Sequence, residues 1–173
     1  MPRVVFMCGP AGSGKSTVAR ELEAGGLVRL SFDDAAWARG LRTMPLSKQA
    51  YAEIEQDLQR RLVGLVRDGH DVVLDLSFWS REMRERYRRL LAPLGVTPET
   101  IYLQTPREVA LARVRARQAA HGDDYRLADD VAAAYFDQFE PPSATEGPLR
   151  VIRYEDGEDS TPRGQTQPSR TAR

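Results

Sequence analysis

The fold of this chain is decided by the stretch Gly9-Pro10-Ala11-Gly12-Ser13-Gly14-Lys15-Ser16-Thr17. It follows the apolar run Val4 to Cys8 and leads into a helix-forming segment that begins at Val18. A strand, the pattern G-x-x-x-x-G-K-S and then a helix is the context that a Walker A phosphate loop requires. Glycines let backbone N–H groups turn inward on a phosphate chain, and the helix start adds unpaired amides and a positive dipole end. The motif therefore predicts that the protein binds a nucleoside triphosphate.

The residues of this loop have distinct expected roles. Lys15 is expected to reach the β- and γ-phosphates, and the Ser16 hydroxyl is expected to ligate Mg²⁺. The nucleotide-binding set is Gly9, Ala11, Gly12, Ser13, Gly14, Lys15, Ser16 and Thr17. A glycine-rich turn with a chance lysine is the alternative, which is disfavoured because every fixed position is filled and both flanks fit. ATP with Mg²⁺ is the expected cofactor, because the chain carries no N-K-x-D motif for guanine.

Length and composition narrow the class of protein. The 173 residues suit one domain, and 25 Lys+Arg against 25 Asp+Glu give a formal net charge of zero. This balance argues against a chain whose main task is to neutralise long stretches of nucleic acid. A single cysteine, Cys8, excludes an internal disulfide and favours a reducing compartment. No apolar run approaches the roughly 18 residues of a membrane span, and no signal peptide is recognisable, so a cytoplasmic protein, monomer or homodimer, is expected.

Apolar runs alternate with helical patterns along the chain. Strands are expected at 4–8, 27–31, 71–76, 100–103 and 149–153. Between them, helices are expected after the loop and at 47–68, 80–91, 106–120 and 127–139, with a short helix or turn at 35–41. This alternation predicts an α/β fold, a parallel sheet of about five strands with helices on both faces, in the P-loop kinase arrangement. The kinase domain is expected to span 1–154, with a helical lid around 106–140 and a disordered tail at 155–173.

Three aspartates follow predicted strands and are candidates for chemistry at the carboxyl ends of those strands. Asp33 and Asp34 follow the second strand, where a carboxylate facing the γ-phosphate could accept the proton of an acceptor hydroxyl. Asp33 is the preferred base and Asp34 a substrate-binding residue; the alternative is that Asp33 only caps the next helix. Asp75 ends the third strand and is expected to serve Mg²⁺ through water or to hold the acceptor. A merely polar strand end would still need a buried partner.

Arginines supply the candidate positive charges. Arg113 and Arg117 lie four residues apart on one helix face, where they could neutralise charge on the transferring phosphoryl group. Arg126 is a further candidate from the same segment, and a solvated helix face is the alternative. Arg81 opens a densely basic helix and is a candidate for substrate binding, although a solvated face with internal ion pairs is the usual interpretation of such a helix. Nucleic-acid contact by this helix is a less favoured possibility.

Two tryptophans complete the candidate set. Trp37 and Trp79 each lie shortly after a predicted strand end and could line the acceptor site, although core packing is equally compatible with the sequence. The histidines are isolated, and neither histidine nor cysteine forms a metal-ligand cluster.

Together these residues resemble the family of small AAA-like P-loop kinases, which includes the kinase domain of bacterial and phage polynucleotide kinases. Chloramphenicol phosphotransferase and zeta toxins are similar at a greater distance. The likeness covers about Met1 to Arg153 and is carried by Gly9 to Thr17, Ser31-Phe32-Asp33-Asp34, Val73-Leu74-Asp75-Leu76-Ser77, the helix from Leu111 to Arg117, and Phe139-Glu140-Pro141-Pro142 with Glu146-Gly147. The resemblance implies that Lys15 and Ser16 hold phosphate and metal, that Asp33 is the general base, and that Arg113 and Arg117 are lid arginines.

One departure from the family pattern affects the expected acceptor. Polynucleotide kinases place an arginine shortly after the catalytic aspartate, where it binds the acceptor's phosphate, whereas here Asp34-Ala35-Ala36-Trp37 follows. Arg39 or Arg42 would have to substitute. The expected function is therefore a kinase that phosphorylates a hydroxyl of a small molecule, a metabolite or an antibiotic-like compound. A polynucleotide 5′-hydroxyl kinase, a non-catalytic nucleotide-dependent switch and a toxin acting on a nucleotide sugar are the alternatives.

Overall fold

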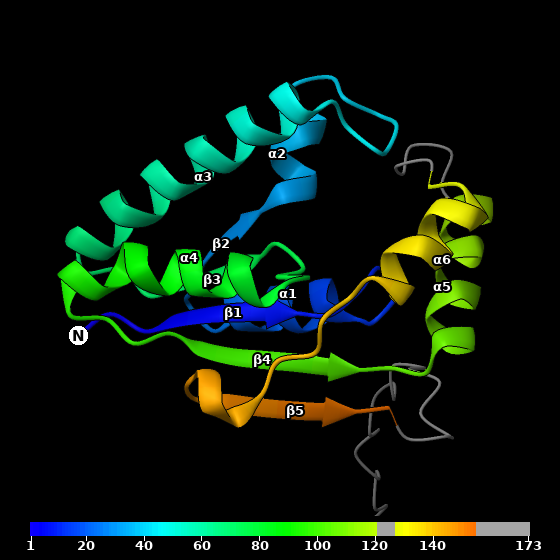
Figure 1. The fold of residues 1–173 in the computed structure, drawn as a ribbon. Coiled ribbons are helices and arrows are strands. Elements are labelled where there is room, and N and C mark those ends of the chain that lie inside the picture. The colour runs from blue at the N-terminus through cyan, green and yellow to red at the C-terminus, as the bar shows by residue number, and fades with distance from the viewer. Residues whose placement is uncertain (121–126, 155–173) are drawn as a thin grey trace, which may run out of the picture.

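A parallel sheet of five strands runs through the centre of the computed structural model, which describes residues 1–120 and 127–154 (Figure 1). The strands are β1 (Val4–Cys8), β2 (Val28–Ser31), β3 (Val72–Asp75), β4 (Glu99–Gln104) and β5 (Leu149–Arg153). Their order across the sheet is β2-β3-β1-β4-β5, and every neighbouring pair is parallel. Because β1 is central, the loop that follows it emerges in the middle of the edge where the strands end, here called the carboxyl edge.

Helices cover both faces of the sheet and its carboxyl edge (Figure 1). The helices are α1 (Lys15–Ala24), α2 (Phe32–Ala38), α3 (Lys48–Arg67), α4 (Arg81–Leu91), α5 (Arg107–Ala120) and α6 (Asp129–Asp137), with short 3₁₀ turns η1 (Ala92–Leu94) and η2 (Ala144–Glu146). Helices α3 and α4 pack on one face, and α1 packs on the other. Helices α5 and α6 pack on each other at the end toward which the strands point.

The alternation of side chains along β1 explains the two layers of core. Val4, Phe6 and Cys8 point into the cluster beneath α3 and α4, whereas Val5 and Met7 point into the cluster beneath α1. All five residues are buried, as a central parallel strand covered on both faces requires. Burial also raises the pKa of the Cys8 thiol to about 12, so this cysteine is a packing residue.

One segment departs from the sequence prediction. The second helix was expected from Ala35, but α2 begins at Phe32, directly after β2. The prediction is wrong because Ser31 ends the strand in an extended conformation and also caps the helix, its Oγ accepting the N–H of Asp34 at 3.2 Å. No loop separates the two elements, so Asp33 lies in the first turn of α2. The other strands and helices agree with the predicted segments.

Two groups of expectations fall outside the described residues: Arg126 as a lid arginine, and the tail at 155–173. Over the described ranges, no helix combines the length and apolar character needed to cross a membrane.

Candidate active site

The phosphate loop has the backbone geometry that the motif predicts. Gly12 and Gly14 have φ angles of 80° and 92°, which L side chains rarely adopt. Helix α1 begins at Lys15, and its N-cap residue, Gly14, provides no side-chain hydrogen bond to the first amides. Amides at an uncapped helix start need another partner, and an anion is a common one. The loop therefore has the features of an anion site at the centre of the carboxyl edge.

Helix α5 and the residues before it donate hydrogen bonds to carbonyl groups of the phosphate loop. The Thr105 hydroxyl donates to the Ser13 carbonyl at 3.1 Å, and an Arg113 Nη1 donates to the Gly12 carbonyl at 3.3 Å. In a trans peptide the carbonyl and the N–H point in opposite directions. The N–H of Gly14, which shares its peptide with the Ser13 carbonyl, thus points away from Thr105 and into the loop.

Gly12 gives a sharp test of this packing. A Cβ on Gly12 would lie 2.1 Å from the Ala110 carbonyl oxygen, a backbone atom that cannot move aside without displacing α5. We expect Gly12→Ala to abolish ATP binding, measured by isothermal titration calorimetry, and to lower the melting temperature. Gly40→Ala is the matched control, because Gly40 has a φ of 78° against 80° for Gly12 but nothing within 4 Å of the point that a Cβ would occupy. Unchanged ATP affinity in Gly12→Ala would contradict the loop assignment.

Asp75 provides a buried carboxylate at the end of β3. Only 5% of the residue is exposed, and its Oδ2 accepts an Arg29 Nη2 hydrogen bond at 3.4 Å. Its Oδ1 is buried and has no hydrogen-bond partner among the described residues. An unsatisfied buried carboxylate oxygen is costly and indicates an absent partner. Such an oxygen fits a water of a hydrated Mg²⁺ ion or an acceptor hydroxyl.

Asp33 lies within electrostatic range of the lysine of the phosphate loop. The residue as a whole is exposed to solvent. The protein atoms around the Asp33 carboxylate nevertheless desolvate it, and this raises the pKa of Asp33. Lys15 and Arg117 oppose this rise, while Asp75 and Asp34 add to it. Lys15 has the largest effect of these charges. Asp33, Asp75 and Lys15 therefore lie within electrostatic range of one another at the carboxyl edge.

Asp34 is directed toward Arg29. Its carboxylate accepts from Arg29 Nη1 at 2.7 Å, and its side chain is 66% exposed. Arg29 joins Asp34 to Asp75 through its two terminal nitrogens. Of the two adjacent aspartates, Asp34 is held in an ion pair by Arg29, and the choice of Asp33 as the base stays a prediction. Sequence analysis did not identify Arg29, because a basic residue inside a short strand carries no motif.

The two predicted lid arginines have different surroundings. Arg117 acts electrostatically on the Asp33 carboxylate, which places its charge on the acceptor side of the loop. The Arg113 guanidinium lies beside the loop, bonded to the Gly12 carbonyl and 5.3 Å from the centre of the Tyr154 ring. Roles in phosphoryl transfer stay predictions for both Arg113 and Arg117.

The remaining substrate-binding candidates, Trp79, Trp37 and Arg81, differ in their surroundings. Trp79 is 48% exposed, and its indole is near enough to the Tyr51 hydroxyl to lower the pKa of that group against the rise caused by burial. The Trp37 ring lies under the Arg42 guanidinium, 3.6 Å from the ring centre. The Arg81 side chain bonds to Glu85, one helical turn further along, at 2.7 Å. Its described contacts thus hold Arg81 on its own helix, and substrate binding by Arg81 stays a prediction without support.

Arg84 corrects the interpretation of the basic helix as a solvated face. It is fully buried, and its guanidinium bonds to both carboxylate oxygens of Glu146, at 2.8 and 3.0 Å. The spacing of Arg84 in the sequence could have indicated its burial. Arg84 lies three residues before Tyr87 and seven before Leu91, on the face of α4 that packs against the sheet.

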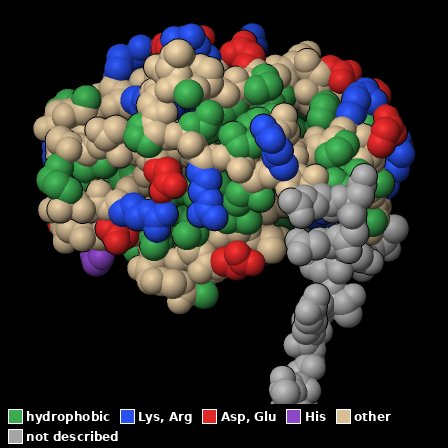
Figure 2. All heavy atoms as spheres, turned by 90° about the horizontal axis from the view of Figure 1, so that it is seen from below, with side chains coloured by type: hydrophobic (Ala, Val, Ile, Leu, Met, Phe, Trp, Pro, Cys, Tyr) green, Lys and Arg blue, Asp and Glu red, His purple; other side chains and the backbone are tan. Residues whose placement is uncertain are grey.

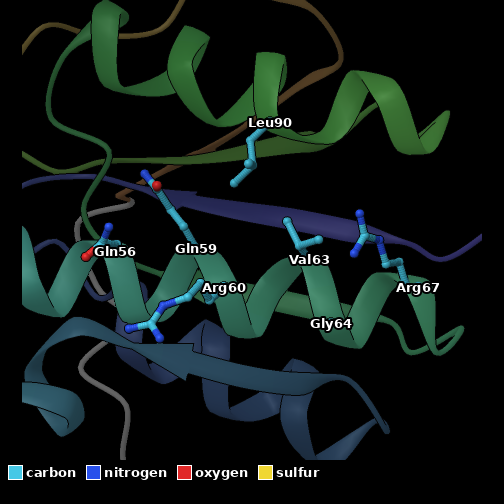
Figure 3. Close-up of a pocket in the computed structure, with 7 residues that line it drawn as sticks. All are labelled: Gln56, Gln59, Arg60, Val63, Gly64, Arg67 and Leu90. Atoms are coloured by element: carbon cyan, nitrogen blue, oxygen red, sulfur yellow. The ribbon is translucent and has the colours of Figure 1, made fainter.

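One surface groove lies away from these residues. It has a volume of about 360 Å³ and runs between α3 and α4, lined in part by Gln59, Val63, Gly64 and Leu90 (Figure 3). It contains none of the residues that the sequence predicted for nucleotide or acceptor binding. The candidate active site is therefore the carboxyl edge, argued from its charges and loop geometry.

The strand order, the phosphate loop and the carboxylates at the same edge of the sheet define a P-loop kinase. The chain belongs to the small AAA-like P-loop kinases: a family model described as "AAA domain" matches residues 4–142. It is 34% identical over 133 residues to a cytidylate kinase of Natronomonas pharaonis, covering 71% of this chain and 69% of that protein. A cytidylate kinase of Haloarcula marismortui is 30% identical over 139 residues, with 73% and 71% covered.

Solved structures confirm the fold. A protein of Chloroflexus aurantiacus assigned as a kinase superimposes with a TM-score of 0.75 over 92% of both chains, at 20% identity. This level of identity supports the arrangement of strands and helices and leaves the acceptor to be argued from the site.

Proposed function

We propose that this protein is an ATP- and Mg²⁺-dependent kinase that transfers the γ-phosphate to a hydroxyl group of a small molecule. The observation that supports the proposal is the Asp33 carboxylate at the carboxyl edge, on which the charges of Lys15, Asp75 and Arg117 all act. A carboxylate opposite the phosphate loop can orient an acceptor hydroxyl and accept its proton. Phosphoryl transfer needs little further covalent chemistry, so positioning and charge account for the rest of the rate.

Each residue has a role in this proposal. The loop amides and Lys15 bind the triphosphate, and Arg117 neutralises charge near the transferring group. Ser16 and, through water, the unsatisfied Oδ1 of Asp75 would hold Mg²⁺. When bound, Mg²⁺ would neutralise phosphate charge. Arg29 holds the Asp75 carboxylate in place by its ion pair.

A nucleoside monophosphate is the second candidate acceptor, favoured by the names of the two cytidylate kinase relatives. Such an acceptor needs arginines to bind its phosphate. The two arginines that could take this part have other contacts: Arg39 lies 3.7 Å from Glu53 and 3.9 Å from Asp57, and Arg42 stacks on Trp37. These contacts favour an acceptor without a phosphate.

A polynucleotide acceptor has less support. The face seen in Figure 2 carries basic and acidic side chains mixed among apolar ones, without a continuous basic area. A chain of zero formal net charge offers little long-range attraction for a polyanion. Transfer to a labelled oligonucleotide would nevertheless decide this alternative directly.

The pH dependence of the reaction follows from Asp33. A general base must be ionised, and the Asp33 pKa is raised above its ordinary value of 3.8. We expect kcat/KM to fall tenfold per pH unit on the acid side of this raised pKa and to level off on its alkaline side. The measurement is the pH profile of ADP release at saturating Mg²⁺, with melting temperatures taken at each pH. A profile that stays flat down to pH values where the protein remains folded would contradict the role of Asp33.

The acceptor class can be identified by a coupled assay of ADP release against alcohols, sugars, nucleosides, aminoglycosides, CMP and a 5′-hydroxyl oligonucleotide. We expect release to depend on a compound with a free hydroxyl and to be lost in Asp33→Asn. Release that depends on CMP alone would favour the nucleotide acceptor and overturn the proposal.

A further inference from the structure

Four aromatic side chains from separate elements meet beside Asp33. Phe32, its neighbour in the chain, packs on Tyr51 of α3 with ring centres 4.8 Å apart. The Trp79 indole and Tyr135 of α6 are both near enough to the Tyr51 hydroxyl to affect its pKa. The cluster thus links the end of β2, the start of α3, the segment after β3 and α6.

Two members of this cluster are open to solvent. Trp79 is 48% exposed and Tyr135 41% exposed, whereas Phe32 and Tyr51 are partly buried beneath them. Binding sites for small molecules are lined mainly by apolar and aromatic side chains with a few polar groups, and these rings lie in the region that contains Asp33. The polar groups of Trp79 and Tyr135 are solvated or hydrogen-bonded, so a ligand would contact the flat faces of the two rings.

The backbone that presents Trp79 is strained, which is independent evidence for a role. Ser77 and Phe78 have φ angles of 68° and 48°, in the left-handed region that residues other than glycine rarely adopt. Three hydrogen bonds hold this turn: Gly9 N–H to the Ser77 carbonyl at 3.0 Å, and Cys8 Sγ and Arg84 Nη1 to the Phe78 carbonyl at 3.4 and 2.9 Å. Strain of this kind persists where the surroundings over-determine it, commonly at functional sites.

The position after the strained turn is fixed as well. The Trp79 carbonyl accepts the N–H of Glu140 at 2.8 Å, and the Glu140 carboxylate accepts the N–H of Arg81 at 2.9 Å. The segment that follows α6 is therefore tied to the start of α4. Trp79 and Tyr135 are held on a common support, because α6 and this segment are continuous in the chain.

We propose that the exposed rings of Trp79 and Tyr135 form a platform for the ring of the acceptor, and that the acceptor is an uncharged, ring-bearing alcohol, a nucleoside or a glycoside. This inference rests on the proposed function, because it places the acceptor's hydroxyl at Asp33. The charges agree with it: the arginines of α4 nearest the platform are paired, Arg81 with Glu85 and Arg86 with Glu55, each at 2.7 Å. Aromatic faces bind planar bases and the apolar faces of sugars without requiring charge.

The first test measures binding without turnover. In a Trp37→Phe background, Trp79 is the only indole of the two in the chain, and its fluorescence is titrated with cytidine, methyl α-glucopyranoside and CMP in the presence of ADP. We expect a saturable change with cytidine or with the glycoside, which distinguishes the two sources of the ring. No change with either compound at millimolar concentration, or a stronger response to CMP than to cytidine, would overturn the inference.

The second test separates acceptor binding from nucleotide binding. Trp79→Ala and Tyr135→Ala should each raise the KM of the acceptor found in the screen by about 10- to 100-fold, the loss typical of a truncated stacking ring. The KM of ATP should not change, and Trp79→Phe should restore acceptor binding. Val151→Ala is the matched control, because Val151 is as exposed as Tyr135, at 41%, and lies on β5.

The outcomes separate the inference from the proposed function. Alcohol-dependent ADP release with an acceptor KM that is the same in Trp79→Ala would remove the platform and leave the kinase. Ring binding that requires Trp79 without any phosphate transfer would remove the proposed kinase activity and leave the platform.

Discussion

Asp33→Asn is expected to lower kcat by about 10²- to 10⁴-fold, the range that a lost general base causes. The change keeps the size and polarity of the side chain and removes the charge on which Lys15 acts. ATP binding should persist or become tighter, since a negative charge near the triphosphate is removed. The measurement is acceptor-dependent ADP release at saturating ATP, together with calorimetric titration of ATP.

Asp57→Asn provides the matched control, because Asp57 is also a solvent-accessible aspartate near arginines, on the outer side of α3. It should change kcat by less than about twofold, the ordinary effect of a surface substitution. If Asp33→Asn retained full activity while Lys15→Ala lost all function, the protein would be a nucleotide-dependent switch, and the kinase proposal would fail.

The second large effect is expected at the buried ion pair between Arg84 and Glu146. The two side chains are 0% and 3% exposed, and the Arg84 guanidinium also donates to the carbonyls of Phe78 and Glu140 at 2.9 and 2.8 Å. Glu146→Gln would leave a buried guanidinium without its counter-charge. We expect a loss of about 3–5 kcal/mol in the free energy of unfolding, measured by urea titration.

Asp137→Asn is the matched control for this pair. Arg107 and Asp137 form the same two-pronged contact, at 2.9 and 3.1 Å, but their side chains are 41% and 57% exposed. Solvent screening weakens such a pair, so Asp137→Asn should lower the free energy of unfolding far less than Glu146→Gln. Equal losses in the two variants would show that burial does not determine the strength of the Arg84–Glu146 pair.

The same pair predicts how stability depends on pH. Burial by itself raises the pKa of Glu146, but hydrogen bonds from Arg84, the Ser143 amide and Arg88 outweigh it and lower the pKa from 4.5 to about 2. The folded protein therefore binds this proton less readily than the unfolded chain. The stabilisation is complete above pH 4.5 and is lost as the pH falls from 4.5 toward 2. Glu146→Gln should remove this part of the acid dependence.

Much of the fold could be predicted because its signals are local. The loop motif, the buried apolar runs and the alternation of strands and helices are properties of contiguous residues. The start of α2 was missed because Ser31 belongs to β2 and caps the helix at the same time. Because one residue ends the strand and caps the helix, no loop lies between β2 and α2 that could have marked the start of the helix in the sequence.

The site could be predicted only in part, since its decisive features are relations between distant residues. The position of Asp33 after a strand was visible, but its preference over Asp34 depends on Arg29, which draws Asp34 toward itself. The left-handed turn at Ser77 and Phe78 contains neither glycine nor asparagine, so no sequence signal marks it. The aromatic cluster likewise exists only once α3, α6 and the segment after β3 are packed together.

The most direct test of the central claim is the chemical nature of the phosphorylated product. Product formed from ATP, Mg²⁺ and the acceptor identified by the screen should be examined by ³¹P nuclear magnetic resonance. A hydroxyl acceptor positioned at Asp33 predicts a new phosphate monoester resonance alongside ADP, absent in Asp33→Asn. A new phosphoanhydride resonance, as from a nucleotide acceptor, or inorganic phosphate alone, would contradict the account.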